Sequence, residues 1–244
     1  MKQRWTQLSV LALPLLLFSG AANATLLAPG STTPITATTE SGTWVAGATG
    51  TIRICSDTNN CIATTVATAT ATENVYQEAG GFLDFAYQFT NNTACPPASA
   101  CDSLEHLTVT SYGNIGSPGN PGNVDVYYLN NLPGAPAPDQ FSVQTSPGPT
   151  AGNPFTANRS SNAGTVVGFN FTGTNAVAPG EESAIYLIKT DSKIIGPGTF
   201  SLLDGGTGSS SAYLSPVPEP GFYGLLAIGL AVAFVFVKYR KQTA

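Results

Sequence analysis

The side chains that could do chemistry are few in this 244-residue chain, and they are scattered along it. The one histidine, His106, stands in the alternating stretch "LEHLTVT", with Leu107 and Val109 on the opposite face. This pattern favours a solvated side chain over a general base. Glu181 and Glu182 are adjacent in the turn-like "APGEESA", where neighbouring side chains diverge. We expect no enzyme activity, although carboxylates that converge in the folded chain could still support glycoside hydrolysis.

The four cysteines form two pairs with the same C-x5-C spacing, Cys55 with Cys61 and Cys95 with Cys101. An even cysteine count in an exported chain predicts disulfides. We favour the two short pairings because "CSDTNNC" and "CPPASAC" both read as turns, and the other two connectivities stay open. The alternative is that the four cysteines bind zinc, but their spacing and an oxidising compartment disfavour a zinc site.

The first cysteine pair also encloses Asp57, Asn59 and Asn60, which resemble part of an oxygen-ligand loop. A calcium loop needs six or more oxygens, and the further carboxylates are missing at the required positions. An Asx turn inside a disulfide loop explains these residues equally well. We therefore expect neither a bound metal nor a cofactor.

The first 24 residues have the pattern of a signal peptide. Lys2 and Arg4 precede a short apolar stretch, and Ala22-Asn23-Ala24 matches the small-x-small cleavage site. We expect export and cleavage by signal peptidase after Ala24. An uncleaved N-terminal anchor is the alternative, although the apolar stretch is short for a membrane span.

A second apolar run, residues 221–237, carries no charge and is followed by Lys238, Arg240 and Lys241. As a helix with a rise of about 1.5 Å per residue, it would reach roughly 25 Å, the low end of what crosses a bilayer. The basic cluster predicts a cytoplasmic tail, with everything before residue 221 outside. We therefore expect this C-terminal helix to anchor the chain in a membrane.

The exported part between the two ends is strongly acidic. It holds four basic and thirteen acidic residues, a net charge of −9. A field of this sign argues against binding to nucleic acid or to an anionic membrane surface. It suits a soluble surface protein of about 190 residues, which is enough for one domain with a core.

The residue pattern between the two ends predicts a series of β-strands. Residues alternate between apolar and polar in "FLDFAYQFTNN", "VVGFNFT", "NVDVYYL" and "TIRIC", which is typical of half-buried strands, and "TFSLLDGG" closes the set. "SAIYLIKT" is apolar on both faces, as in a central strand. Clusters of Gly, Pro, Asn and Ser separate these runs. We predict an all-β fold, an antiparallel β-sandwich over residues 25–205.

Three segments are less regular. "TTVATATATE" predicts an edge strand with a small-residue inner face, with an ice-binding or crystal-binding threonine array and O-linked glycosylation as alternatives. The proline-rich loops between Asn114 and Asn158 are long for a sandwich, and could be mobile or form a recognition edge. Residues 206–217 have the composition of a Gly/Ser/Pro linker.

The C-terminal end resembles the PEP-CTERM sorting signal. Its three parts stand in order over residues 218–241, as the motif Pro218-Glu219-Pro220, the apolar run and the basic cluster. The two prolines favour an extended backbone at Glu219, which a processing enzyme could read as a strand. The resemblance implies that the chain is held in the inner membrane through its C-terminus and handled by an exosortase, with later release or attachment at the cell surface. It also implies a link to exopolysaccharide and biofilm.

A weaker resemblance covers "LDFAYQFTNN", "GTVVGFNFT" and "APGEESAIYLIKTDSKIIGPGTFSLLDGG", which are similar to a β-rich ectodomain often joined to this tail. We interpret the chain as a non-enzymatic surface or extracellular-matrix protein, with exosortase and exopolysaccharide as expected partners. One alternative is a carbohydrate-binding or adhesive module that uses Tyr112, Tyr127 and Tyr128. Another is a plain single-pass membrane protein whose tail is never cut.

Overall fold

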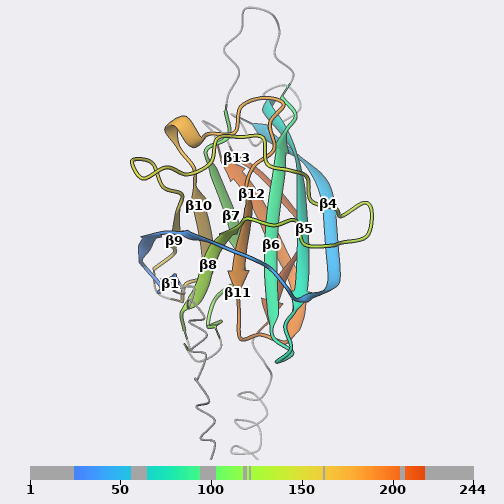
Figure 1. Cartoon of the computed structure of the whole chain (residues 1–244), viewed down its shortest axis with the longest axis vertical. Helices are drawn as coiled ribbons and strands as arrows, with labels where there is room; N and C mark the ends of the chain where they lie inside the picture. Colours follow the sequence, from blue (N-terminus) through green and yellow to red (C-terminus); the bar gives the residue numbers. More distant parts are fainter. Residues whose placement is uncertain are drawn as a thin grey trace, which may run out of the picture.

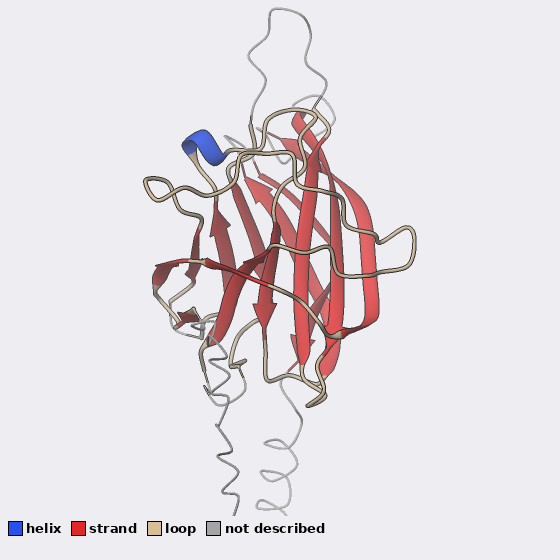
Figure 2. Ribbon diagram, in the orientation of Figure 1, coloured by secondary structure: helices blue, strands red, loops and turns tan. Residues whose placement is uncertain are grey.

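The computed structural model describes residues 25–55, 65–93, 103–117, 120, 122–161, 163–203 and 207–217. These residues form thirteen β-strands and one short 3-10 helix, and none of them lies in an α-helix (Figure 1, Figure 2). The first strands are β1 (Leu26–Leu27), β2 (Thr32–Pro34), β3 (Thr36–Thr38), β4 (Thr43–Cys55), β5 (Thr65–Gln77) and β6 (Leu83–Asn91). The later elements are β7 (His106–Thr110), β8 (Val124–Leu129), β9 (Thr156–Arg159), β10 (Val166–Asn170), η2 (Gly173–Asn175), β11 (Ile185–Lys189), β12 (Ile194–Leu203) and β13 (Thr207–Val217).

The strands form two antiparallel layers. One layer has the order β8-β11-β6-β5-β4 and the other the order β13-β12-β7-β10-β9. They join where Cys55 at the end of β4 pairs with Thr207 at the start of β13. The short strands β1 and β3 pair with β8, and β2 pairs with β9. Apart from the short strand β3, which pairs parallel with β8, the expected all-β antiparallel architecture is confirmed for the described part of the chain.

The core lies between the layers, and the alternating residues of β6 show how the sequence builds it. Phe85, Tyr87 and Phe89 are at most 1% exposed, as their period-two spacing predicts. The rings of Tyr87 and Phe200 lie 5.9 Å apart, and those of Phe89 and Phe171 lie 5.4 Å apart. These contacts join β6 to β12 and to the end of β10, so aromatic packing holds the two layers together.

The other face of β6 differs from the prediction of a half-buried strand. Asp84 is 1% exposed and Gln88 is 2% exposed, so polar residues expected at the surface are covered. A second apolar cluster lies on this face and includes Tyr76, Phe141 and Leu187. The period-two alternation correctly predicted which residues share a face of β6. Both of these faces are buried, however, and not only the inner one.

The cover is the proline-rich segment between β8 and β9, here called the strap (residues 130–155). In Figure 2 it crosses the strands as a long tan segment. Gln88 exchanges two hydrogen bonds with the backbone of Ser142, and the side-chain amide of Asn74 donates to the Asp139 carbonyl over 2.6 Å. Phe141 packs into the cluster beneath it. The strap is therefore a packed part of the fold.

The threonine-alanine stretch forms β5, whose position differs from the expected edge strand. β5 pairs with β4 on one side and with β6 on the other, so it is an interior strand of its layer. The small-residue inner face is confirmed, because the alanines on it are at most 1% exposed: Ala67, Ala69 and Ala71. Small side chains leave room for the aromatic residues of the opposite layer.

The expected linker at residues 206–217 is wrong, because Thr207–Val217 form β13. This strand pairs with β12 along its length. Tyr213 is 3% exposed and Ser215 is 1% exposed, so its inner face belongs to the core. Glycine and serine composition resembles that of a linker, but the aromatic Tyr213 supplies the buried contact that holds the segment in the sheet.

The described chain begins and ends at the same end of the sandwich. Leu27 pairs with Val124 in β8, and Asp125 of β8 lies opposite Lys189 at the end of β11. A short turn then leads to Ile194, whose partner is Val217. We call this the motif-proximal end. Cys55 lies at the far end, about 30 Å away along β13 at roughly 3.3 Å per residue.

Candidate functional site

The last described residue, Val217, is held by two specific contacts, one with the turn before β12 and one with β12 itself. The Ser192 hydroxyl donates to the Val217 carbonyl over 2.7 Å, and it accepts the N–H of Ile194 over 3.2 Å. The Val217 side chain lies over Gly196, where an added Cβ would come within 2.4 Å of Cγ2. The position of the end of β13 therefore depends on the Ser192 hydroxyl and on the absence of a side chain at Gly196.

Two further polar contacts hold the same half of β13. The backbone N–H of Leu214 donates to a Glu73 carboxylate oxygen over 2.6 Å, which ties β13 to β5 through the core. The Ser215 hydroxyl donates to the Pro197 carbonyl over 2.7 Å. Side chains thus supply hydrogen bonds where proline and glycine in β12 weaken the backbone ladder.

Ser192 lies on the turn between β11 and β12, residues 190–193, and this turn is anchored to other elements. The Thr190 hydroxyl donates to the Leu83 carbonyl over 2.7 Å, and the Leu83 N–H donates to the Ser192 carbonyl over 2.9 Å. Asp191 exchanges two hydrogen bonds with the backbone of Gly116. The turn is therefore a fixed support for the Ser192 hydroxyl.

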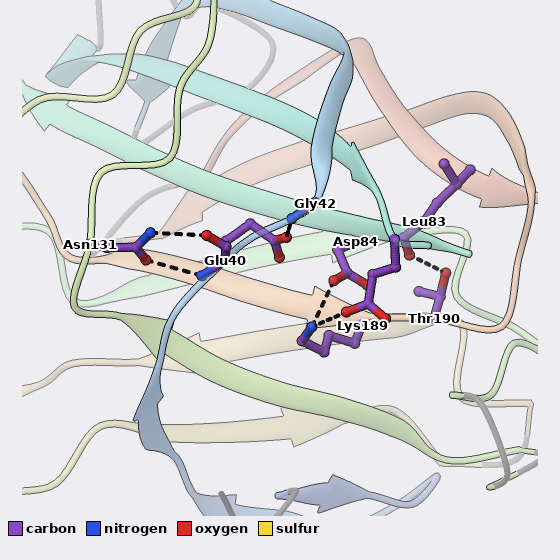
Figure 3. A network of polar contacts seen from close by, with 8 residues as sticks. Glu40, Gly42, Leu83, Asp84, Asn131, Lys189 and Thr190 are labelled. Carbon is purple, nitrogen blue, oxygen red and sulfur yellow. Dashed lines mark hydrogen bonds and ion pairs between the residues drawn. The ribbon is translucent and has the colours of Figure 1, made fainter. Parts of the chain in front are cut away.

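Lys189, just before the turn, forms ion pairs with two acidic residues of β6 and its preceding loop (Figure 3). Its ammonium lies 2.9 Å from Asp84 Oδ2 and also contacts Glu78. Burial raises the pKa of Asp84, and the charge of Lys189 opposes that rise. Burial alone would lower the pKa of Lys189, but Asp84 and Glu78 together raise it. Lys189 is therefore a charged partner for a largely buried carboxyl group.

Figure 3 also shows Glu40, which lies on the segment leading to β4. Its backbone exchanges two hydrogen bonds with the Asn131 side chain at the start of the strap, and one of its carboxylate oxygens accepts the Gly42 N–H. Within the described residues, no group of three or more His, Cys, Asp or Glu side chains could hold a metal ion. The acidic residues near Lys189 thus brace neighbouring segments.

Arg159 fixes the chain where β1 ends. The side chain is 4% exposed, and its five N–H donors all reach backbone carbonyls, those of Leu27, Tyr112, Ile115, Gly122 and Gly164. Because a guanidinium has five donors, this buried cation is fully hydrogen-bonded without an acidic partner in that set. The first strand and the loops beside it are held at the motif-proximal end by one residue.

Glu73 lies inside the core, 0% exposed, opposite Tyr87 in the β5–β6 register. Burial raises its pKa to about 8, although the hydrogen bond from Leu214 acts in the opposite direction. The Tyr87 and Tyr112 hydroxyls lie 2.7 Å apart beside it. At neutral pH the carboxyl group is therefore mainly protonated, which reduces the cost of its burial.

The residues first considered for catalysis do not come together. His106 begins β7 and pairs with Asn170 and Leu203, with Leu107 and Val109 buried on the opposite face as expected. Its pKa is lowered by burial, against the effect of Asn170. The expected divergence at the turn is also seen. Glu181 accepts the N–H of Ala178, whereas Glu182 accepts the hydroxyl of Thr90.

The three tyrosines considered for carbohydrate binding do not form an exposed patch. Tyr112 is 0% exposed and Tyr127 is 5% exposed. Tyr128 is only partly buried, and its ring packs edge-on against Phe155 at 5.5 Å. The structure thus corrects the expectation that these rings are available to a sugar.

Several predictions concern residues outside the described part of the chain. These are the signal cleavage site at Ala22 and Ala24, the loop residues Asp57, Asn59 and Asn60, three cysteines (Cys61, Cys95 and Cys101), the motif Pro218-Glu219-Pro220, the apolar run 221–237, and the basic residues Lys238, Arg240 and Lys241. Cys55 ends β4 at the far end of the sandwich, and its thiol is not free. Its pairing stays a prediction.

No helix within the described ranges is long and apolar enough to cross a membrane.

The residues that hold the end of β13 were not found from the sequence. The string "KTDSKIIGPG" indicates a turn followed by a weak strand, but nothing in it singles out Ser192 or Gly196. Their role depends on which strand lies beside them.

The comparisons with known proteins found one match, to a family model that covers the C-terminal end of the chain. Residues 216–241 match the family model described as the PEP-CTERM protein-sorting motif, and no curated protein and no solved structure matches the chain. The motif implies an exported, cell-surface-directed protein with exosortase as its processing partner. Pro216 and Val217 belong both to the matched region and to β13. The expected PEP-CTERM sorting motif is confirmed, and it begins inside the last strand of the sandwich.

Proposed function

We propose that this chain is a non-enzymatic surface or extracellular-matrix protein, which exosortase processes at the motif and delivers as a folded β-sandwich. The observation that carries the proposal is the motif match at residues 216–241, which starts within β13. The carboxyl groups near the motif support a structural role. Lys189 forms ion pairs with Glu78 and Asp84, and Glu73 is buried beside Leu214.

The arrangement of the chain ends supports delivery in a defined orientation. Leu27 and Val217 lie at the same end of the sandwich, so a chain held by its tail has this end toward the membrane. The far end, with Cys55, then projects outward. Release at the motif would leave the strand pairings of the sandwich intact up to Val217.

We further propose that the delivered domain acts in an exopolysaccharide-rich matrix. Its surplus of acidic residues keeps it soluble and argues against adhesion to anionic membranes. A carbohydrate-binding module is the second possibility, and its support has to come from surfaces other than Tyr112 and Tyr127, which are buried. A glycan array probed with the processed, purified protein separates these two roles.

Fractionation of the native host tests the sorting proposal. Immunoblots of the inner membrane, cell surface and medium are compared for the wild-type chain, Glu219→Ala, and a variant with Lys238, Arg240 and Lys241 changed to alanine. We expect both variants to accumulate unprocessed in cell membranes. Glu105→Ala, the same change within the sandwich, serves as the control and should behave like wild type. An unchanged distribution of both tail variants would favour a plain membrane anchor and contradict the proposal.

A further inference from the structure

We propose that the last residues of β13 form a latch, which must separate from β12 before exosortase can process the sorting motif. This inference rests on the proposed function and adds a regulatory step to it. The matched region begins at Pro216, and Glu219 of the motif follows Val217 by two residues. Folding of the sandwich therefore restricts the chain directly beside the motif.

The folded end of β13 is poorly accessible to an enzyme that reads an extended peptide. Such an enzyme pairs with the backbone of its substrate and holds alternate side chains in pockets. Here Ser215 is 1% exposed, and the Val217 carbonyl already accepts the Ser192 hydroxyl. β12 occupies one side of the strand as far as the pair Ile194–Val217. We infer that the enzyme uses these residues only after they leave β12.

The composition of the ladder makes such opening feasible. Pro216 lies opposite Ile195 and has no N–H to donate, and Pro197 lies opposite Leu214. Gly196 and Gly198 flank Pro197, so this part of β12 has few side chains that could pack across the pair. Serine hydroxyls provide compensating hydrogen bonds, from Ser215 to β12 and from Ser192 to Val217. Local opening of a strand end needs far less free energy than global unfolding.

The latch predicts that the rate of processing by exosortase depends on these contacts. If processing requires the open form, the observed rate scales with the open fraction. Ser192→Ala removes the hydroxyl that holds Val217, and Gly196→Ala places a Cβ 2.4 Å from Val217 Cγ2, which forces the two strands to shift. Each change should speed processing of the full chain, roughly threefold to tenfold for the loss of one such contact. Thr90→Val removes a hydroxyl hydrogen bond to Glu182 near the other end of β6, away from β13 and from the turn that holds Ser192, and should leave the rate unchanged.

A disulfide cross-link between β12 and β13 tests the opposite effect, a slower rate of processing. Ile194 and Val217 are direct partners at the end of the ladder, and neighbouring strands bring such Cα atoms within reach of a disulfide. The double variant Ile194→Cys with Val217→Cys should be processed at least about tenfold more slowly when oxidised than after reduction. Wild-type protein treated with the same reductant controls for effects on the other cysteines. Comparing the two redox states of one variant also separates locking from any effect of changing Val217.

Pulse-chase labelling of the full chain in a host with its exosortase measures the half-life of the unprocessed form. Thermal unfolding of each variant, extracted as the full chain, verifies that it is folded. The latch is supported if Ser192→Ala and Gly196→Ala shorten the half-life, and the oxidised cross-link lengthens it. Wild-type half-lives for all three would overturn it. Glu219→Ala distinguishes the two proposals, because normal processing of that variant would overturn the proposed function itself.

Discussion

The carboxyl group of Glu73 accepts the backbone N–H of Leu214 over 2.6 Å inside the core, where Glu73 is 0% exposed. The two residues come from opposite layers, Glu73 from β5 and Leu214 from β13. This contact gives the Leu214 N–H a buried acceptor, in a strand whose last residues belong to the matched sorting region. A polar group in the core thus helps to hold the end of the chain in place.

Glu73→Gln should make the stability of the sandwich less dependent on pH. Burial raises the pKa of Glu73 from its ordinary value of 4.5 to about 8. The folded state therefore binds this proton more tightly than the unfolded state. The resulting stability is fully present below pH 4.5 and is lost as the pH rises through 8, at about 1.4 kcal/mol per pH unit. Glutamine keeps the acceptor for Leu214 and cannot ionise.

Urea unfolding of wild type and Glu73→Gln at pH 5 and pH 9 measures this effect. We expect the variant to gain stability relative to wild type between the two values. Glu105→Gln, at a partly exposed position, serves as the control. Parallel pH profiles for wild type and Glu73→Gln would show that Glu73 does not ionise differently in the folded state.

Arg159→Lys should destabilise the protein even though it keeps the positive charge. The guanidinium satisfies five backbone carbonyls at once, whereas an ammonium has three donors and cannot reproduce that fork. We expect a loss of about 3 kcal/mol in the free energy of unfolding. Arg53→Lys, on the exposed side of β4, should cost less than about 0.5 kcal/mol in the same denaturant titration. Equal effects at the two positions would contradict this role for Arg159.

Lys189→Met should destabilise the sandwich more at pH 8 than at pH 5. Without the lysine, the buried Asp84 has no cationic partner in its ion pair, and its pKa rises further in the folded state. The folded variant must then keep Asp84 protonated, so its stability falls as the pH rises above the unfolded value of about 3.9. We expect a loss of about 3 kcal/mol at pH 8 and a smaller one at pH 5.

The control for Lys189 is Lys193→Met, on the adjoining turn, where the ammonium lies 4.9 Å from the ring centre of Phe82. Loss of this cation–π contact should cost about 0.5 to 1 kcal/mol with little dependence on pH. Thermal unfolding of both variants at the two pH values provides the comparison. A pH-independent loss for Lys189→Met would argue that its methylene chain, and not its charge, supplies the stability.

All four cysteines should be oxidised in the exported protein. Cys55 is not free, and an oxidising compartment favours the remaining pairs. Intact-mass analysis after alkylation without reductant should detect no labelled cysteine, and peptide mapping should recover Cys55 joined to Cys61. Four labelled thiols would contradict the disulfides, and a bridge from Cys55 to Cys95 or Cys101 would contradict the favoured pairing.

The inward faces of the strands could be predicted because they depend on local alternation. Phe85, Tyr87 and Phe89 alternate with polar residues, and all three are buried in the core. The burial of Asp84 and Gln88 could not be predicted in the same way. It depends on the strap, which begins 39 residues after the end of β6 and whose proline-rich sequence resembles a free loop.

Strand neighbours were the second limit of prediction. The alternating residues of β5 indicate a strand with one small-residue face, but not whether β4 and β6 lie on both sides of it. β13 shows the same limit, because its glycine and serine content resembles a linker until β12 lies beside it. The tail motif was predicted more fully, since its order of residues carries the signal. The roles of Ser192 and Gly196 depend on strand pairing and could not be predicted.

The mass and location of the protein with and without its exosortase test the central claim most directly. With the enzyme present, we predict that the sandwich leaves the inner membrane and carries a C-terminus shortened near the motif. In a strain that lacks the enzyme, the chain should stay in the inner membrane with its tail intact. The same mass and the same membrane fraction in both strains would contradict the account.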